Sequence, residues 1–176
     1  MRKSVGMALV CALILLGFIA VDYMVDPPGI IGKVQGQKNA SSFLQHLMAG
    51  EEEKAFDSLY FHDGAIDEEV KISYEDAKAI WVKRVKNKRN QGTYIMDYHD
   101  LRIRSHDGWV DGDAKITVMN NGKPAIFDVS INFQPVNGTW KVASLQSWRN
   151  ITEDRDAQDE EWEEIIHGYL PNEKEK

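Results

Sequence analysis

The chain has 176 residues, with 21 basic and 28 acidic side chains and a formal net charge of −7. A single cysteine excludes an intramolecular disulfide, so packing alone has to hold the fold together. The predicted domain, residues 39–149, has about 110 residues, which is enough to form a hydrophobic core. Residues 153–176 carry ten acidic and three basic side chains, so the whole net charge lies in this last segment.

An uncharged apolar run opens the chain. The run Val5–Val21 has seventeen residues without charge, Asn, Gln or Pro, and it follows Arg2 and Lys3. At about 1.5 Å per residue it covers about 25 Å, just short of the roughly 30 Å hydrocarbon core, and residues 23–25 can extend it. We therefore predict a signal anchor over residues 1–25, with the basic N-terminus in the cytoplasm. The predicted anchor residues are Val5, Leu9, Leu13, Leu16, Phe18 and Val21.

The alternative to a retained anchor is a cleaved signal peptide, which shares the basic start and the apolar core. Cleavage after Ala20 would place Phe18 where a small side chain is wanted, so the retained anchor is favoured. We expect a single-pass protein of the cell membrane with an extracytoplasmic C-terminal domain. Residues 26–38 contain two prolines and three glycines without a sustained period, which predicts a linker.

Helical spacing of apolar residues begins after the predicted linker. Between Ser41 and Phe61 two apolar groups follow one another, with Gly50 between them, which predicts two helices. Ser73 is placed to cap a third helix. Its expected apolar face consists of Ala77, Ile80, Trp81 and Val85. The basic residues 83–89 suit the solvated C-terminal end of this helix, and we predict no nucleic-acid partner.

From residue 92 onward the apolar period changes to two, which indicates strands. The dipeptides Asp107-Gly108, Asn121-Gly122 and Asn137-Gly138 separate the apolar runs and are typical of tight hairpin turns. The pattern predicts an antiparallel meander of four strands, so the fold class is α+β, with helices packed on a curved, cone-like sheet.

Two strands carry further information. In residues 126–134 the apolar side chains share one face, while the other face is expected to meet water or a pocket. That apolar face consists of Phe127, Val129, Ile131 and Phe133. In the first strand the apolar residues change from even to odd positions near His99 and Asp100, which predicts a β-bulge there.

The acidic segment 150–176 contains one narrow apolar stripe. The stripe consists of Trp162, Ile165, Ile166 and Tyr169. We predict a short acidic helix that docks through these residues, and the alternative is a free solvated tail.

Helices followed by a bent antiparallel sheet resemble the nuclear transport factor 2-like superfamily, a cone-shaped α+β fold. The stretch SFLQHLMAGEEEKAFDSLY resembles its opening helix pair, and NGTWKVASL resembles its last strand. The resemblance covers residues 39–149. Membrane-anchored members similar to this chain occur on bacterial cell surfaces and in type IV secretion and conjugation machines. A rival resemblance is to mitochondrial inner-membrane import and oxidase-assembly factors, whose fold begins with less helix.

The resemblance implies a pocket between sheet and helices, which enzymes of the superfamily line with proton-transfer groups. The expected pocket residues are Tyr60, Trp81, Tyr94, Tyr98 and Trp140. Asp97, His99 and Tyr98 are the candidates for acid–base chemistry, because burial can bring the pKa of a carboxyl or imidazole near working pH. The strand face shared by Asp97 and His99 lies beside the parity switch and can point to solvent instead, so we predict no catalytic residue.

The tripeptides His62-Asp63-Gly64 and His106-Asp107-Gly108 invite a metal interpretation. However, His99 and His106 are seven residues apart and fall on opposite faces of a regular strand, and Asp-Gly is a turn signature. Phosphate-binding glycine loops are also absent from the sequence. We predict neither a metal site nor a cofactor.

The favoured interpretation is a non-enzymatic extracytoplasmic domain that binds a protein or small ligand at the membrane surface. One alternative is a subunit of a type IV secretion or conjugation-type membrane complex. In that case the chain can associate with further copies of itself in the membrane. The other alternative is a pocket enzyme that uses Asp, His and Tyr groups for proton transfer.

Overall fold

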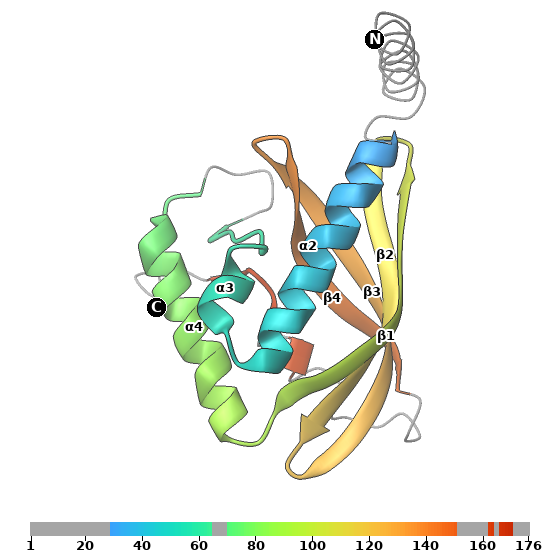
Figure 1. Ribbon diagram of the computed structural model, residues 1–176. Coiled ribbons are helices and arrows are strands. Elements are labelled where there is room, and N and C mark those ends of the chain that lie inside the picture. The colour runs from blue at the N-terminus through green and yellow to red at the C-terminus, as the bar shows by residue number, and fades with distance from the viewer. Residues whose placement is uncertain (1–28, 65–69, 151–161, 164–165, 171–176) are drawn as a thin grey trace, which may run out of the picture.

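The computed structural model describes residues 29–64, 70–150, 162–163 and 166–170, which form an α+β fold (Figure 1). The elements are α2 Gly29–Ala49, α3 Glu52–Phe56, α4 Tyr74–Asn90, β1 Tyr94–His106, β2 Trp109–Asn120, β3 Lys123–Val136 and β4 Thr139–Asn150. The predicted anchor over residues 1–25 lies outside these ranges. Within them, no helix is both long and apolar enough to cross a bilayer.

Helix α2 corrects the predicted linker. The linker prediction for residues 26–38 is wrong from residue 29 onward, because α2 runs without a break to Ala49. The small residues Gly29, Gly32, Gly36 and Ala40 are buried along one face of this helix. A Cβ atom at Gly36 would lie 2.9 Å from Val110 Cγ1 and 3.0 Å from Ile103 Cγ2. Gly36 therefore serves close packing of the helix on the sheet, which only a residue without a side chain allows.

Helix α4 begins where the sequence predicts. The Ser73 hydroxyl accepts a hydrogen bond from the backbone N–H of Asp76 at 3.1 Å, which satisfies one of the open donors of the first turn. The predicted apolar face is correct at three positions, but Ile80 is 45% exposed and Val82 is buried instead. The second predicted helix is shorter than expected, because α3 ends at Phe56.

The four predicted strands and their three turns are confirmed. The sheet has the order β1-β2-β3-β4, and every neighbouring pair is antiparallel. The first residue of each turn, Asp107, Asn121 or Asn137, has a φ of 47° to 50°, and the glycine that follows is also left-handed. Two consecutive left-handed residues fit the right-handed twist of a hairpin, which explains the choice of Asp-Gly and Asn-Gly.

The predicted bulge in β1 is also confirmed. The register with β2 shifts between His99 and Arg102, and Asp100 adopts a φ of 57°. The bulge lets the strand bend while it keeps apolar residues on the side of α2. In β3 the predicted core face is buried at all four positions.

The described part of the C-terminal segment packs on the core, but not through all of the residues that the sequence predicts. Trp162 and Ile166 are buried as predicted, but Tyr169 is 40% exposed and Leu170 is buried in its place. The indole N–H of Trp81 donates to the Ile166 carbonyl at 3.3 Å. Ile165 and most of the predicted acidic helix lie outside the described residues. The described part of this segment therefore belongs to the core of the domain.

Asp57, which follows α3, fastens α4 to the rest of the domain. Its carboxylate accepts hydrogen bonds from Lys78 Nζ at 2.8 Å and from the Tyr74 hydroxyl. Burial opposes its ionisation, but these two hydrogen bonds and the charges of Lys78 and Lys141 together outweigh burial and hold the pKa of Asp57 below its ordinary value of 3.8. The carboxylate therefore stabilises the fold above the unfolded-state pKa of about 4, and this contribution is lost as the pH falls.

Replacing Asp57 with asparagine is expected to lower stability at pH 7 by less than about 1 kcal/mol, because the side chain is largely exposed. The difference from the unchanged protein should shrink as the pH falls below about 4 and the native carboxylate becomes protonated. Thermal unfolding at a series of pH values measures this. A difference in Tm that stays constant down to pH 2 would contradict it.

Candidate functional site

The space between helices and sheet, where a pocket is expected, is filled by side chains. Trp81, Phe127 and Trp140 are all buried in one continuous core. A cavity between the described residues of this interface has about 20 Å³, which is room for about one water molecule. Its walls are formed by Leu47, Val85, Arg89, Thr93, Tyr94, Ile95, Val118, Trp162 and Ile166. Of the five predicted pocket residues, only Tyr94 borders it.

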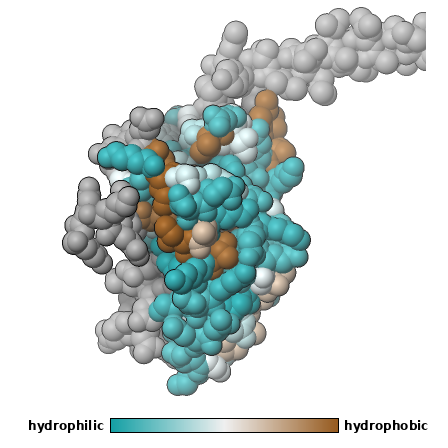
Figure 2. All heavy atoms as spheres, turned by 90° about the vertical axis from the view of Figure 1, so that its left-hand side faces the viewer, coloured by the Kyte–Doolittle hydropathy of each residue, from teal (hydrophilic) through white to brown (hydrophobic). Residues whose placement is uncertain are grey.

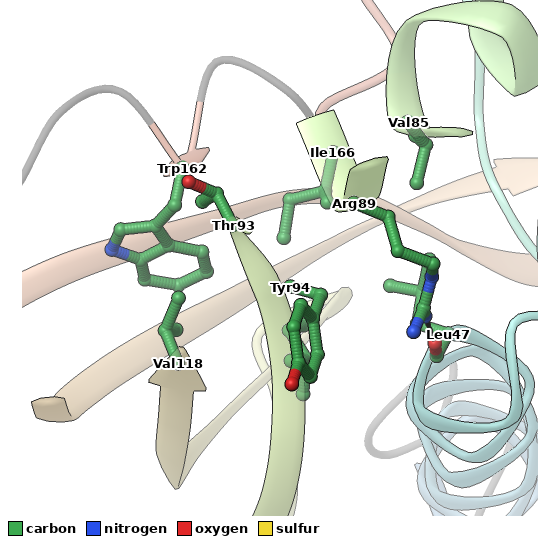
Figure 3. A pocket seen from close by; sticks show the side chains of 9 residues that line it. Leu47, Val85, Arg89, Thr93, Tyr94, Val118, Trp162 and Ile166 are labelled. Atoms are coloured by element: carbon green, nitrogen blue, oxygen red, sulfur yellow. Dashed lines mark hydrogen bonds between the residues drawn. The ribbon is translucent and has the colours of Figure 1, made fainter. Parts of the chain in front are cut away.

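Figure 3 shows how this cavity is closed: Trp162 and Ile166 of the C-terminal segment lie on one side, and Arg89 reaches toward Leu47 on the other. Arg89 Nε donates to Glu52 Oε1 at 2.9 Å, and its guanidinium also donates to the Leu47 carbonyl. Glu52 is only 1% exposed, so Arg89 compensates a buried carboxylate. The polar groups here stabilise the fold and leave no space for a substrate.

The structure does not assemble the acid–base candidates into a pocket. Asp97 and His99 are exposed on β1, and the Asp97 carboxylate accepts the backbone N–H of Tyr98 at 2.8 Å. The half-buried Tyr98 accepts a hydrogen bond from Gln45 Nε2 at 3.3 Å. None of the three borders the small cavity or the hollow described next. Their positions at the bulged edge strand explain why they miss the interior.

A hollow of about 610 Å³ is lined by residues of the polar face of β2, β3 and β4, which alternate along the strands with the buried residues beneath α2. Three facing residues cross this floor in register, Asp111 on β2, Asn132 on β3 and Ser144 on β4. Asn132 Nδ2 donates to Ser144 Oγ at 3.0 Å. The hollow is lined by His62, His106, Trp109, Val110, Asp111, Asn132, Phe133, Gln134, Ala143, Ser144, Gln146, His167 and Tyr169.

One rim of the hollow joins two segments that are distant in sequence. His62 and Tyr169 pair in a parallel bridge, and their rings lie 5.3 Å apart. His62 Nδ1 lies 2.7 Å from the Gly64 carbonyl and donates to it, which fixes the orientation of the ring. Arg84 donates to the carbonyls of His167 and Tyr169 and so fixes the C-terminal segment against α4.

The charges at the opposite rim are compensated within the protein. Arg104 forms ion pairs with Asp113 and Asp111, and hydrogen bonds to these two carboxylates raise the pKa of Arg104. His106 Nδ1 lies 3.3 Å from Asp111 Oδ2. The hollow therefore offers amide, hydroxyl and imidazole groups beside two exposed aromatic rings, Trp109 at 59% and Tyr169 at 40%.

His62 and His106 of the two repeated tripeptides both line this hollow, at opposite rims, which the sequence could not show. Within the part of the chain that the structure describes, no three His, Cys, Asp or Glu side chains are grouped to hold a metal ion. The only sequence signal for the hollow was the polar alternation of β3, which left a pocket on that face open. The rim residues His62, His167 and Tyr169 gave no such signal.

Comparison with known proteins adds no constraint: no family model, no curated protein and no solved structure matches the chain.

Proposed function

We propose that the chain is a membrane-tethered extracytoplasmic binding domain of the nuclear transport factor 2-like type, and that it is not an enzyme. Its partner binds in the hollow over the polar face of the sheet. The apolar run Val5–Val21 supports the tether, and the order of helices before a bent four-stranded meander supports the fold type.

The observation that carries this proposal is the contrast between the two faces of the sheet. The helix side keeps a cavity of about 20 Å³, whereas the polar side has a hollow of about 610 Å³. Ligand sites usually have roughly 300–1,000 Å³, and of these two spaces between described residues the hollow on the polar side has a suitable volume. An enzyme of cone type would need its acid and base inside the cone, and Asp97 and His99 are exposed on the bulged strand β1.

The lining favours a polypeptide segment as the ligand. Trp109 and Tyr169 supply rigid aromatic contact area at the two ends, which costs little side-chain entropy on binding. Between them, Asn132, Ser144 and Gln146 offer donors and acceptors that can adapt to a backbone or to polar side chains. Aromatic anchors around adaptable amides and hydroxyls are the composition of protein-recognition surfaces.

Site-specific photocrosslinking in the cells that produce the protein tests the proposal. A benzoylphenylalanine placed at Gln146 or at Asn132 is expected to give one and the same protein adduct. The matched control is Lys123, which is exposed at the β2–β3 turn on the far end of the sheet. Adducts of equal yield at residue 123, or different proteins captured at 146 and 132, would contradict a defined site.

A further inference from the structure

The first two turns of α2 expose a group of branched apolar side chains. Ile30 is 66% exposed and Val34 is 61% exposed, and Ile31 beside them is 44% exposed. Ile30 and Val34 are four residues apart and therefore lie on the same side of the helix. Figure 2 shows apolar atoms at this end of the molecule, where the described chain begins. A cluster of this kind is more than the scattered exposure that any surface has.

Trp109 belongs to the same end of the molecule. The β1–β2 turn at residues 107–108 lies beside the start of α2, and the β3–β4 turn lies at the same end, whereas the β2–β3 turn lies at the opposite end (Figure 1). Val110 packs beneath Gly36 of α2, so its neighbour Trp109 points to the other face of the sheet at this same end of the molecule. We call Ile30, Ile31, Val34 and Trp109 the apolar end patch.

The sequence before Gly29 indicates what covers this patch. Only the seven residues 22–28 separate Gly29 from the uncharged run Val5–Val21. Seven residues span at most about 25 Å even when fully extended. A run that crosses a bilayer therefore keeps the apolar end patch within that distance of the lipid surface, with the β2–β3 turn pointing away.

The chemistry of the patch fits the interfacial layer of a bilayer. Tryptophan is enriched at the level of the headgroups, and branched aliphatic side chains gain by leaving water at the acyl boundary. Lys33 lies between Ile31 and Val34 and is exposed, and its ammonium group can reach lipid phosphates while its stem stays among apolar neighbours.

We propose that the apolar end patch inserts into the interfacial layer of the membrane and holds the domain upright on it. This inference rests on the proposed membrane tether. Since Trp109 also borders the hollow, one end of the hollow then lies against the bilayer. The partner would reach the site along the membrane surface.

Fluorescence of a labelled full-length chain in lipid vesicles tests this orientation. With Cys11 replaced by serine, one cysteine is introduced at Val34 or, as the matched control, at Lys123, and each is labelled with an environment-sensitive dye. In phosphatidylcholine–phosphatidylglycerol vesicles the label at residue 34 is expected to shift to the blue and to be quenched by brominated acyl chains. The label at residue 123 should show neither effect.

Three outcomes would overturn the proposal and are distinguishable. Co-sedimentation with vesicles but equal, unquenched emission at both positions removes the lipid contact and leaves the tether. Failure to co-sediment removes the tether and the lipid contact together. Disulfide formation between two unlabelled copies at residue 34, without quenching, assigns the patch to a second copy of the chain. In the folded Ile30→Asp variant, whose Tm verifies folding, the quenching at residue 34 should fall.

Discussion

Replacing Arg89 with methionine is expected to lower the free energy of unfolding by about 3–5 kcal/mol, because it leaves a buried carboxylate without its partner. Glu52 is 1% exposed and is bonded by Arg89 Nε at 2.9 Å. The same guanidinium bonds the Leu47 carbonyl at the end of α2, so the change also loosens the junction of α2, α3 and α4. Urea unfolding of the full chain in detergent measures the loss.

Two controls separate the buried charge from a general effect of removing a basic residue. The double variant Arg89→Met with Glu52→Leu should recover much of the loss, since removing both charges leaves no ion uncompensated. Lys86→Met breaks an exposed ion pair with Glu53 and should change stability little. If Arg89→Met is no more damaging than Lys86→Met, Glu52 does not depend on Arg89.

The second large effect is expected where α2 lies closest to the sheet. Leucine at Gly36 would place its Cβ 2.9 Å from Val110 and 3.0 Å from Ile103, and the rest of its side chain has to displace one of them. Overpacking of this kind costs about 1–3 kcal/mol and sometimes more, which exceeds the gain of nearly 1 kcal/mol in helix propensity over glycine.

The matched control is Lys38→Leu, which adds the same side chain to the same helix at an exposed position. It should stay within about 0.5 kcal/mol of the unchanged protein. The difference between the two variants, measured by thermal unfolding, isolates the helix–sheet contact. A flexible linker at this position would tolerate both changes equally, and that result would contradict the helical packing of residues 29–38.

The elements that depend on local chemistry could be predicted from the sequence. The hairpins could be located because Asp-Gly and Asn-Gly adopt the left-handed geometry that a two-residue turn demands. The β1 bulge could be located because the apolar residues change from one strand face to the other next to Asp100, and a bulge is the usual way to keep them all on the core side. The start of α4 followed from the side chain of Ser73, which bonds within its own first turn.

The start of α2 could not be predicted, because local propensity and tertiary packing disagree there. Glycine weakens a helix, so Gly29, Gly32 and Gly36 suggest a linker when they are considered alone. Their spacing of three and four residues forms a smooth helical face, and the benefit of that face exists only when the sheet is beside it.

The candidate site was hidden for a related reason. Its floor comes from alternate residues of β2, β3 and β4, which the strand pattern can place on one face. Its rim depends on the bridge between His62 and Tyr169, which are more than one hundred residues apart and share no local pattern. The sequence also could not show that the space between helices and sheet is filled, because that depends on how Trp81 and Trp140 pack.

The central claim, that binding takes place in the hollow over the polar face, is tested most directly by filling the hollow. With the photoreactive residue at Gln146, the change Ser144→Trp introduces a bulky ring into the floor, and Thr117→Trp introduces the same ring on β2 outside the hollow. We predict that the adduct disappears with Ser144→Trp and persists with Thr117→Trp. An adduct that survives Ser144→Trp unchanged in a folded protein would contradict the proposed site.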